Sequence, residues 1–69
     1  MVFQVGDSVR LVQSPPYFKT AEPMPMMKPA TIVPVGSVGV VLDRKPGGYW
    51  TVRFERGAYL LEEQYLEVV

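Results

Sequence analysis

The sequence predicts an all-β fold: a small five-stranded SH3-like barrel that occupies residues 1–69 as a single domain. Short runs of alternating polar and apolar residues recur along the chain, and glycine-containing turns separate them. No segment carries a helical apolar period long enough for an α-helix. Because a chain of 69 residues buries only about 60% of the surface that its unfolded form exposes, we expect one small core.

The first predicted strand spans residues 9–13, where Val9 and Leu11 alternate with polar neighbours. Ser14-Pro15-Pro16 ends it, because proline has no backbone donor. A long Pro/Met-rich loop between strands 1 and 2 then follows, centred on residues 17–29. Five of the seven prolines lie between positions 15 and 29, so we expect this segment to stay outside the sheet.

The middle of the chain predicts a meander of three strands. Gly36 and Gly39 indicate a bend or a close backbone approach before the second strand, at 40–43. Val38 to Asp43 is apolar on both faces, so its orientation stays open. A proline–glycine turn at 44–48 leads into the clearest strand, residues 49–54, in which Trp50, Val52 and Phe54 share one face.

The end of the chain completes the predicted barrel. Arg56-Gly57 closes a hairpin into a strand at 58–61, a short helical turn follows at 62–64, and the last strand spans 65–69. Alternation predicts a core made of Val9, Leu11, Trp50, Val52, Phe54, Leu60, Leu66 and Val68.

Composition narrows the functional classes. The chain has no Cys and no His, which removes disulfides and the usual zinc ligand sets, and we expect no metal and no cofactor. Without an activated nucleophile or an acid/base pair, no catalytic residue is predicted and the protein is not expected to be an enzyme. Seven basic residues balance seven acidic ones, so no nucleic-acid partner is predicted. No apolar run could span a bilayer; we expect no membrane insertion, a cytoplasmic location and a monomer when free.

The Pro/Met-rich loop remains as the candidate site, and two interpretations stay open. Its methionines and Phe18 could fold back and cap one open end of the barrel, because methionine fills irregular gaps. Alternatively they could form an adaptable apolar contact surface, held extended by the prolines at positions 23, 25 and 29. The second interpretation predicts a binding protein.

Several strings of residues resemble a known family. The most specific is KTAEPMPM at 19–26, preceded by PPY at 15–17; the others are GDxVRLV at 6–12, RxPGGYWxVRF at 44–54, RGA at 56–58 and QYLE at 64–67, where x stands for any residue. Together they resemble the SipA family of small cyanobacterial proteins, named for interaction with the sensor histidine kinase NblS. The resemblance implies an SH3-like adaptor that binds the ATP-binding catalytic region of the kinase and stimulates its autophosphorylation in light and nutrient stress.

On this basis we predict a partner-binding site for the kinase, with anchors from the loop and steering charges from the meander. Its residues are Tyr17, Phe18, Lys19, Thr20, Pro23, Met24, Pro25, Met26, Arg44, Lys45 and Arg53. A weaker resemblance, in Val38-Gly39 and Val52-Arg53-Phe54, favours an alternative. It implies a small accessory subunit of a photosynthetic electron-transfer complex that helps ferredoxin dock, although such a subunit would usually be basic.

Overall fold

The computed structural model describes residues 3–69, so residues 1 and 2 of the predicted domain lie outside the described part. The fold is all-β, which confirms the predicted class. The described chain forms seven strands and two single-turn 3-10 helices. In order these are β1 Ser8–Leu11, β2 Tyr17–Thr20, β3 Met27–Pro29, η1 Ala30–Ile32, β4 Val38–Lys45, β5 Tyr49–Phe54, β6 Gly57–Glu62, η2 Glu63–Tyr65 and β7 Leu66–Val68.

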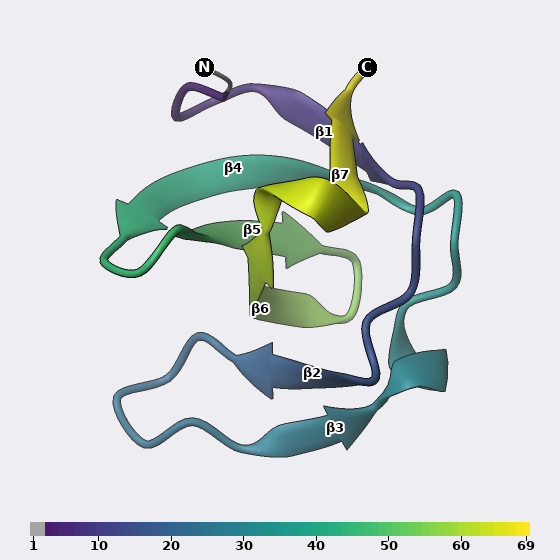
Figure 1. Cartoon of the computed structure of the whole chain (residues 1–69), viewed down its shortest axis with the longest axis vertical. Helices are drawn as coiled ribbons and strands as arrows, with labels where there is room; N and C mark the ends of the chain where they lie inside the picture. The colour runs from purple at the N-terminus through teal and green to yellow at the C-terminus, as the bar shows by residue number, and fades with distance from the viewer. Residues whose placement is uncertain (1–2) are drawn as a thin grey trace.

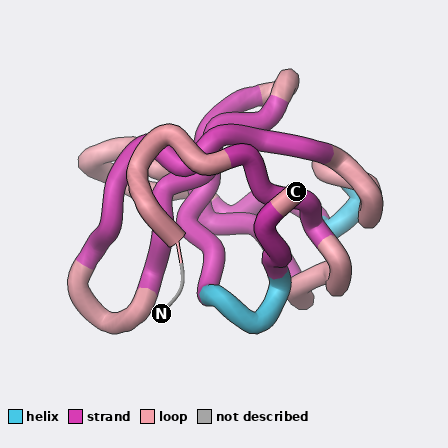
Figure 2. Tube along the Cα trace, turned by 90° about the horizontal axis from the view of Figure 1, so that it is seen from above, coloured by secondary structure: helices cyan, strands magenta, loops and turns pink. Residues whose placement is uncertain are grey.

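All seven strands belong to one antiparallel sheet in the order β3-β2-β6-β5-β4-β1-β7. Within residues 3–69 no pairing joins the edge strands β3 and β7, so the prediction of a five-stranded SH3-like barrel is wrong: the sheet has seven strands and is not closed into a barrel. The sheet curls, and β7 and η2 lie in front of β4 and β5 (Figure 1). Viewed from above, the two helical turns lie at separate places on the periphery of the strands (Figure 2).

The predicted Pro/Met-rich loop is largely a hairpin, and this corrects the expectation that it stays outside the sheet. Strands β2 and β3 pair through Tyr17↔Pro29, Phe18↔Lys28 and Lys19↔Met27. The pairing tolerates the prolines because Pro23 and Pro25 lie in the turn and Pro29 ends an edge strand. Alternation in YFKT, with its second and fourth residues buried, was the strand signal that the prolines obscured.

The core confirms most of the predicted set and corrects two members. Six predicted residues are buried, namely Val9, Leu11, Trp50, Val52, Phe54 and Leu66. Leu60 is only half-buried and Val68 is exposed, whereas Tyr59 and Leu61 are buried. The reason is register: Tyr59 lies opposite Val52 and Leu61 opposite Trp50, so these residues share the inner face. Phe3, Phe18, Val33 and Val41 complete the core.

Strand β4 shows why its sequence had no clear face. Gly39 and Val41 point inward, while Val38 and Leu42 are exposed, and the register shifts between Val41 and Asp43. A β-bulge of this kind changes the alternation along one strand. The close approach predicted for the glycines is confirmed at Gly39, which is buried against β5.

Neither helical turn in residues 3–69 has the length and apolarity that a membrane-spanning helix needs.

Candidate protein-binding surface

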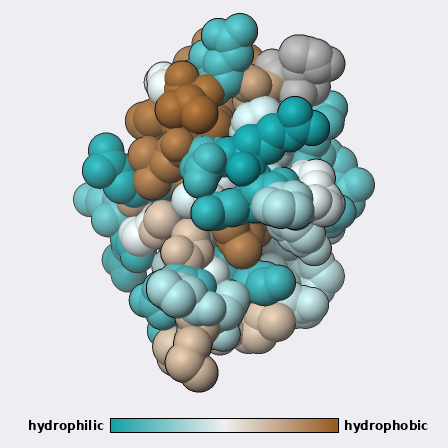
Figure 3. Space-filling view, turned by 90° about the vertical axis from the view of Figure 1, so that its left-hand side faces the viewer, coloured by the Kyte–Doolittle hydropathy of each residue, from teal (hydrophilic) through white to brown (hydrophobic). Residues whose placement is uncertain are grey.

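The Met hairpin, defined here as residues 17–29, projects three methionines into solvent. Met24 is 83% exposed, and Met26 and Met27 are each more than half exposed. Its turn is fixed by two hydrogen bonds: the Thr20 amide donates to the Met26 carbonyl at 2.9 Å, and the Met26 amide donates to the Thr20 hydroxyl at 2.8 Å. In Figure 3 the turn of the hairpin forms the lower end of the molecule and carries moderately hydrophobic side chains. The methionines therefore do not cap the core.

The same hairpin sends two predicted site residues inward, which is a correction. Phe18 is completely buried, and its ring lies 5.4 Å from that of Tyr59 in an edge-to-face contact. Thr20 is also buried, and its hydroxyl oxygen accepts the hydrogen bond from the Met26 amide in the turn. A partner surface cannot reach either side chain without unfolding the hairpin, so Phe18 and Thr20 belong to the scaffold. Tyr17 is half exposed and Lys19 is half-buried.

A groove opens beside the hairpin, between β2 and β6. Within residues 3–69 the pairing of these strands stops at Lys19↔Leu60, although β2 starts two residues earlier, at Tyr17. The resulting hollow has a volume of about 240 Å³. We call it the tyrosine groove; it is lined by Pro15, Pro16, Tyr17, Lys19, Met27, Tyr49, Leu60, Leu61, Glu62 and Tyr65.

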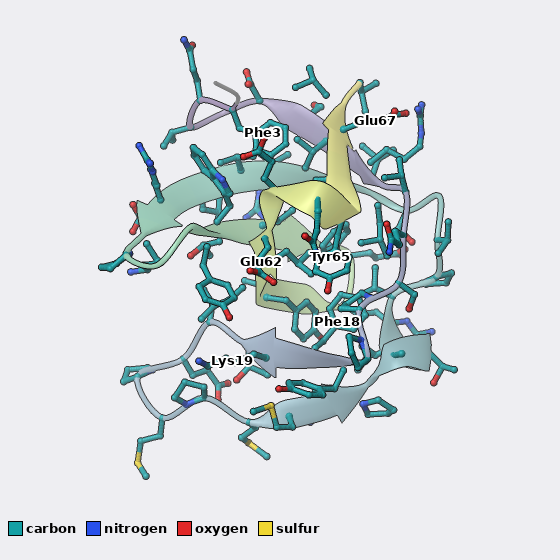
Figure 4. The ribbon with its side chains drawn as sticks, viewed as in Figure 1. Phe3, Phe18, Lys19, Glu62, Tyr65 and Glu67 are labelled. Carbon is teal, nitrogen blue, oxygen red and sulfur yellow. The ribbon has the colours of Figure 1, made fainter. Side chains whose placement is uncertain are left out.

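The tyrosine groove carries charge at its margin. Lys19 places its ammonium 5.6 Å from the centre of the Tyr49 ring, a cation–π distance. Glu62 and Tyr65 extend from the β6–η2 segment above β2, from which Lys19 projects (Figure 4). Glu62 also lines a shallower depression with Gly48, Glu63 and Gln64. The lining of the groove thus includes three tyrosines, one cation at Lys19 and one carboxylate at Glu62.

The three predicted steering charges lie on the meander, apart from the Met hairpin's turn. Arg44 stacks over Trp50, with its guanidinium carbon 5.5 Å from the ring centre, and Lys45 forms an ion pair with Asp43 at 3.2 Å. Arg53 is exposed between Val40 and Ala58 on neighbouring strands. These contacts join the three cations to strands β4, β5 and β6, and none of them involves a methionine.

Asp43 shows the electrostatics of the β4–β5 hairpin. The hydrogen bond from Lys45 lowers the pKa of the Asp43 carboxyl, the backbone amide of Arg44 lowers it further by donating at 2.8 Å, and the charge of Lys45 adds to both effects. Burial opposes them. The Asp43 carboxylate thus binds the Lys45 ammonium and the Arg44 amide at the end of β4, next to the β-bulge.

Sequence reasoning missed the residues that build the groove. Tyr49, Glu62 and Tyr65 come from three different elements, β5, β6 and η2. Tyr49 and Glu62 become neighbours in the groove because β5 pairs with β6 at these two residues. The signal available in the sequence was the set of four tyrosines in a chain without His or Cys, because tyrosine is enriched at binding surfaces. Their spacing contains no information about a shared groove.

A larger hollow, of about 350 Å³, lies at the η1 end of the molecule between Ile32, Pro34, Phe54 and Arg56. Phe54 is the single aromatic residue that lines it, so it offers fewer aromatic anchors than the tyrosine groove. Among the described residues, no three His, Cys, Asp or Glu side chains lie close enough together to hold a metal ion.

Comparison with known proteins identifies the family and overturns the SipA resemblance. The family model described as "Protein CHLORORESPIRATORY REDUCTION 42-like" matches residues 5–66. The chain is 37% identical over 67 residues to the Arabidopsis thaliana protein named "Protein CHLORORESPIRATORY REDUCTION 42, chloroplastic". The match covers 96% of this chain and 55% of that relative, so the chain spans about half of the relative's length.

No solved structure matches the chain significantly. The strings that resembled SipA, including KTAEPMPM at 19–26, lie inside the segment that the family model matches, except for Glu67 at the end of the last string. Short proline- and glycine-rich strings mark turns, and turn residues recur in unrelated small β-proteins. The chain belongs to the CRR42-like family.

Proposed function

We propose that this protein is a non-catalytic accessory protein of a photosynthetic or chlororespiratory electron-transfer complex, and that it acts by binding another protein. The observation that carries the proposal is family membership: the Arabidopsis relative is named for chlororespiration and for the chloroplast. The sequence-based alternative, an accessory subunit of a photosynthetic electron-transfer complex, agrees with that name. The kinase-adaptor interpretation rested on the SipA resemblance and has lost that support.

The exposed Met hairpin supports a binding role. Methionine side chains are flexible and polarisable, so they adapt to a partner surface at little cost. Three exposed methionines gather on this one hairpin, and grouped apolar side chains mark interaction sites more often than scattered ones do. We infer that Met24 and Met26 contact the partner and that Pro23 and Pro25 hold them in an extended turn, which reduces the entropy lost on binding.

The charge distribution argues against ferredoxin docking as the role of this protein. Steering an acidic carrier such as ferredoxin depends on a basic surface, and this chain has a formal net charge of zero. Two of its cations are also held in the fold by ion pairs, Arg10 with Glu67 at 2.9 Å and Lys45 with Asp43. We therefore propose attachment to a complex as the primary role.

The test is affinity purification of the tagged chain from gently solubilised membranes of its source organism, followed by identification of retained complexes. We expect an electron-transfer complex to be retained, and retention to fall at least about fivefold for the Met24→Ala/Met26→Ala variant. Val5→Ala is the matched control, because Val5 is an exposed apolar residue outside the hairpin. Retention of a histidine kinase instead, or of no complex at all, would contradict the proposal.

A further inference from the structure

We propose that the tyrosine groove binds an extended, proline-containing segment of a partner protein that carries a Lys or Arg next to its prolines. This inference deepens the proposed function and rests on it for the nature of the partner, which is a protein. It assigns to the groove a ligand chemistry that is distinct from the apolar contact of the Met hairpin.

The aromatic lining selects the conformation of the ligand. Tyr17 comes from β2, Tyr49 from β5 and Tyr65 from η2, and Pro15 and Pro16 line the same hollow. Aromatic-lined grooves recognise polyproline II segments, because flat rings pack against the ridges of a proline-rich helix. The backbone of such a helix makes no internal hydrogen bonds, so its carbonyls are free to accept from tyrosine hydroxyls.

The walls of the groove are held in place before any ligand binds. The amide of Val12 donates to the carbonyl of Tyr65 at 2.8 Å, which ties η2 to the segment that leads into Pro15. Pro15 itself is buried. On the other side, Lys19 pairs with both Met27 and Leu60, which fixes β2 between β3 and β6. A preformed site and a preformed ligand together lose little conformational entropy on association.

Two glutamates, one in the groove and one beside it, favour a basic ligand, while the cation of the groove, Lys19, lies over Tyr49. Glu62 lines both the groove and the neighbouring depression, where Glu63 lies. Within residues 3–69 neither Glu62 nor Glu63 has an ion-pair partner. A basic side chain of the ligand would complement the two carboxylates. A second copy of this chain fits less well, because the lysines of its two Lys-Pro pairs, Lys28-Pro29 and Lys45-Pro46, lie in the paired strands β3 and β4.

The experiment is a titration of the isotope-labelled protein, followed by its amide NMR signals. The probe is a short blocked peptide of alternating prolines and alanines with one terminal arginine. One control peptide replaces the prolines by alanine, and another replaces the arginine by glutamate. We expect the probe to shift signals of the groove residues, the alanine peptide to shift none, and the glutamate peptide to bind more weakly.

Three protein variants locate the contact. Tyr17→Ala should weaken binding of the probe about fivefold or more, as truncation of an aromatic anchor does. Glu62→Gln should lower the affinity for the arginine peptide about two- to fivefold and should not lower the affinity for the glutamate peptide. Val5→Ala, outside both the groove and the Met hairpin, should leave the affinity unchanged; each variant is first shown to have the wild-type pattern of amide signals.

Three results would overturn the inference: no shifts at saturating peptide, equal binding of the alanine peptide, or shifts confined to the turn of the Met hairpin, residues 21–26, none of which lines the groove. Concentration-dependent shifts at the groove without peptide would also overturn it, in favour of self-association. If the peptide fails while the complex is still retained in the purification, the groove assignment is wrong and the accessory role stands. If the peptide binds while no complex is retained in the purification, the groove assignment stands and the accessory role is wrong.

Discussion

The carbonyl oxygen of Arg53 lies 2.7 Å from the point where a Cβ on Gly39 would be. Val52 and Phe54 are as close to the same point, at 2.8 and 3.0 Å. Because Gly39 has no side chain, the start of β4 can lie this close to the end of β5, its antiparallel neighbour. The packing requirement here comes from backbone, which cannot move aside as the end of a flexible side chain can.

Replacing Gly39 by alanine is therefore expected to destabilise the fold by about 3 kcal/mol, at the upper end for overpacking of a core. The comparison variant is Gly48→Ala. Gly48 has a φ of 84° but open space around it, so it should lose only about 1 kcal/mol for the left-handed backbone. Urea unfolding of the two variants measures both losses, and an equal or smaller loss for Gly39→Ala would contradict the steric account.

The burial of Phe18 predicts opposite outcomes for adjacent residues. Phe18→Ala should cost about 3–5 kcal/mol, because it removes a completely buried ring and its contact with Tyr59. Tyr17→Ala should cost less than about 1 kcal/mol, because Tyr17 is 52% exposed. Thermal unfolding monitored by circular dichroism is the measurement. A stable, folded Phe18→Ala protein would show that the ring is not part of the core.

Removal of the Thr20 hydroxyl should loosen the turn of the Met hairpin. Thr20→Val keeps the shape but leaves the Met26 amide without its acceptor, at an expected cost of about 1–2 kcal/mol. The amide proton of Met26 should then exchange faster with solvent, which hydrogen–deuterium exchange measures. Thr20→Ser retains the hydroxyl and serves as control. Unchanged exchange in the valine variant would rule out this hydrogen bond as the support of the turn.

The same substitution at Thr51 should have the opposite sign. Its hydroxyl is buried and, within residues 3–69, has no hydrogen-bond partner. Thr51→Val replaces a desolvated polar group by a methyl of similar size, so stability should rise by about 1 kcal/mol. The change in the midpoint of urea unfolding tests this. A loss of stability in Thr51→Val would mean that the hydroxyl has a partner in solution, such as bound water.

The lowered pKa of Asp43 predicts a specific dependence on pH. In the folded protein this carboxyl should titrate below its usual 3.8, chiefly through the hydrogen bond from Lys45. The folded state therefore binds this proton more weakly than the unfolded state does, so the stabilisation is present above pH 3.8 and declines as the pH falls through the folded-state pKa. Because the pair is exposed to solvent, the effect on stability should be small.

Carbon-13 NMR of the side-chain carboxyls measures that pKa directly. In Lys45→Met the pKa of Asp43 should rise toward the usual value, and it should stay slightly below it because the Arg44 amide still donates. Lys28→Met is a control, because it removes a charge on β3. An Asp43 pKa that responds equally to both substitutions would indicate a general effect of net charge.

Local sequence determined the central meander. The strand at 49–54 was predicted with its observed bounds, and the turns at Gly47 and Gly57 have the positive φ angles that such turns require. These features depend on residues close together in the chain: alternating side chains, β-branched and aromatic residues, and glycine where L side chains are strained. The helical turn before the last strand was likewise placed to within one residue.

Tertiary structure alone decided the edges of the sheet and the site. Prolines concealed the strand character of residues 17–20, and only pairing with β6 and burial of Phe18 against Tyr59 made that segment a strand. Likewise Leu61 took the core position predicted for Leu60, because pairing with β5 set the register. The tyrosine groove combines residues from remote segments, and their proximity follows from the order of strands in the sheet. Such long-range contacts leave no local pattern, since each residue satisfies its own strand or turn wherever its partner lies in the chain.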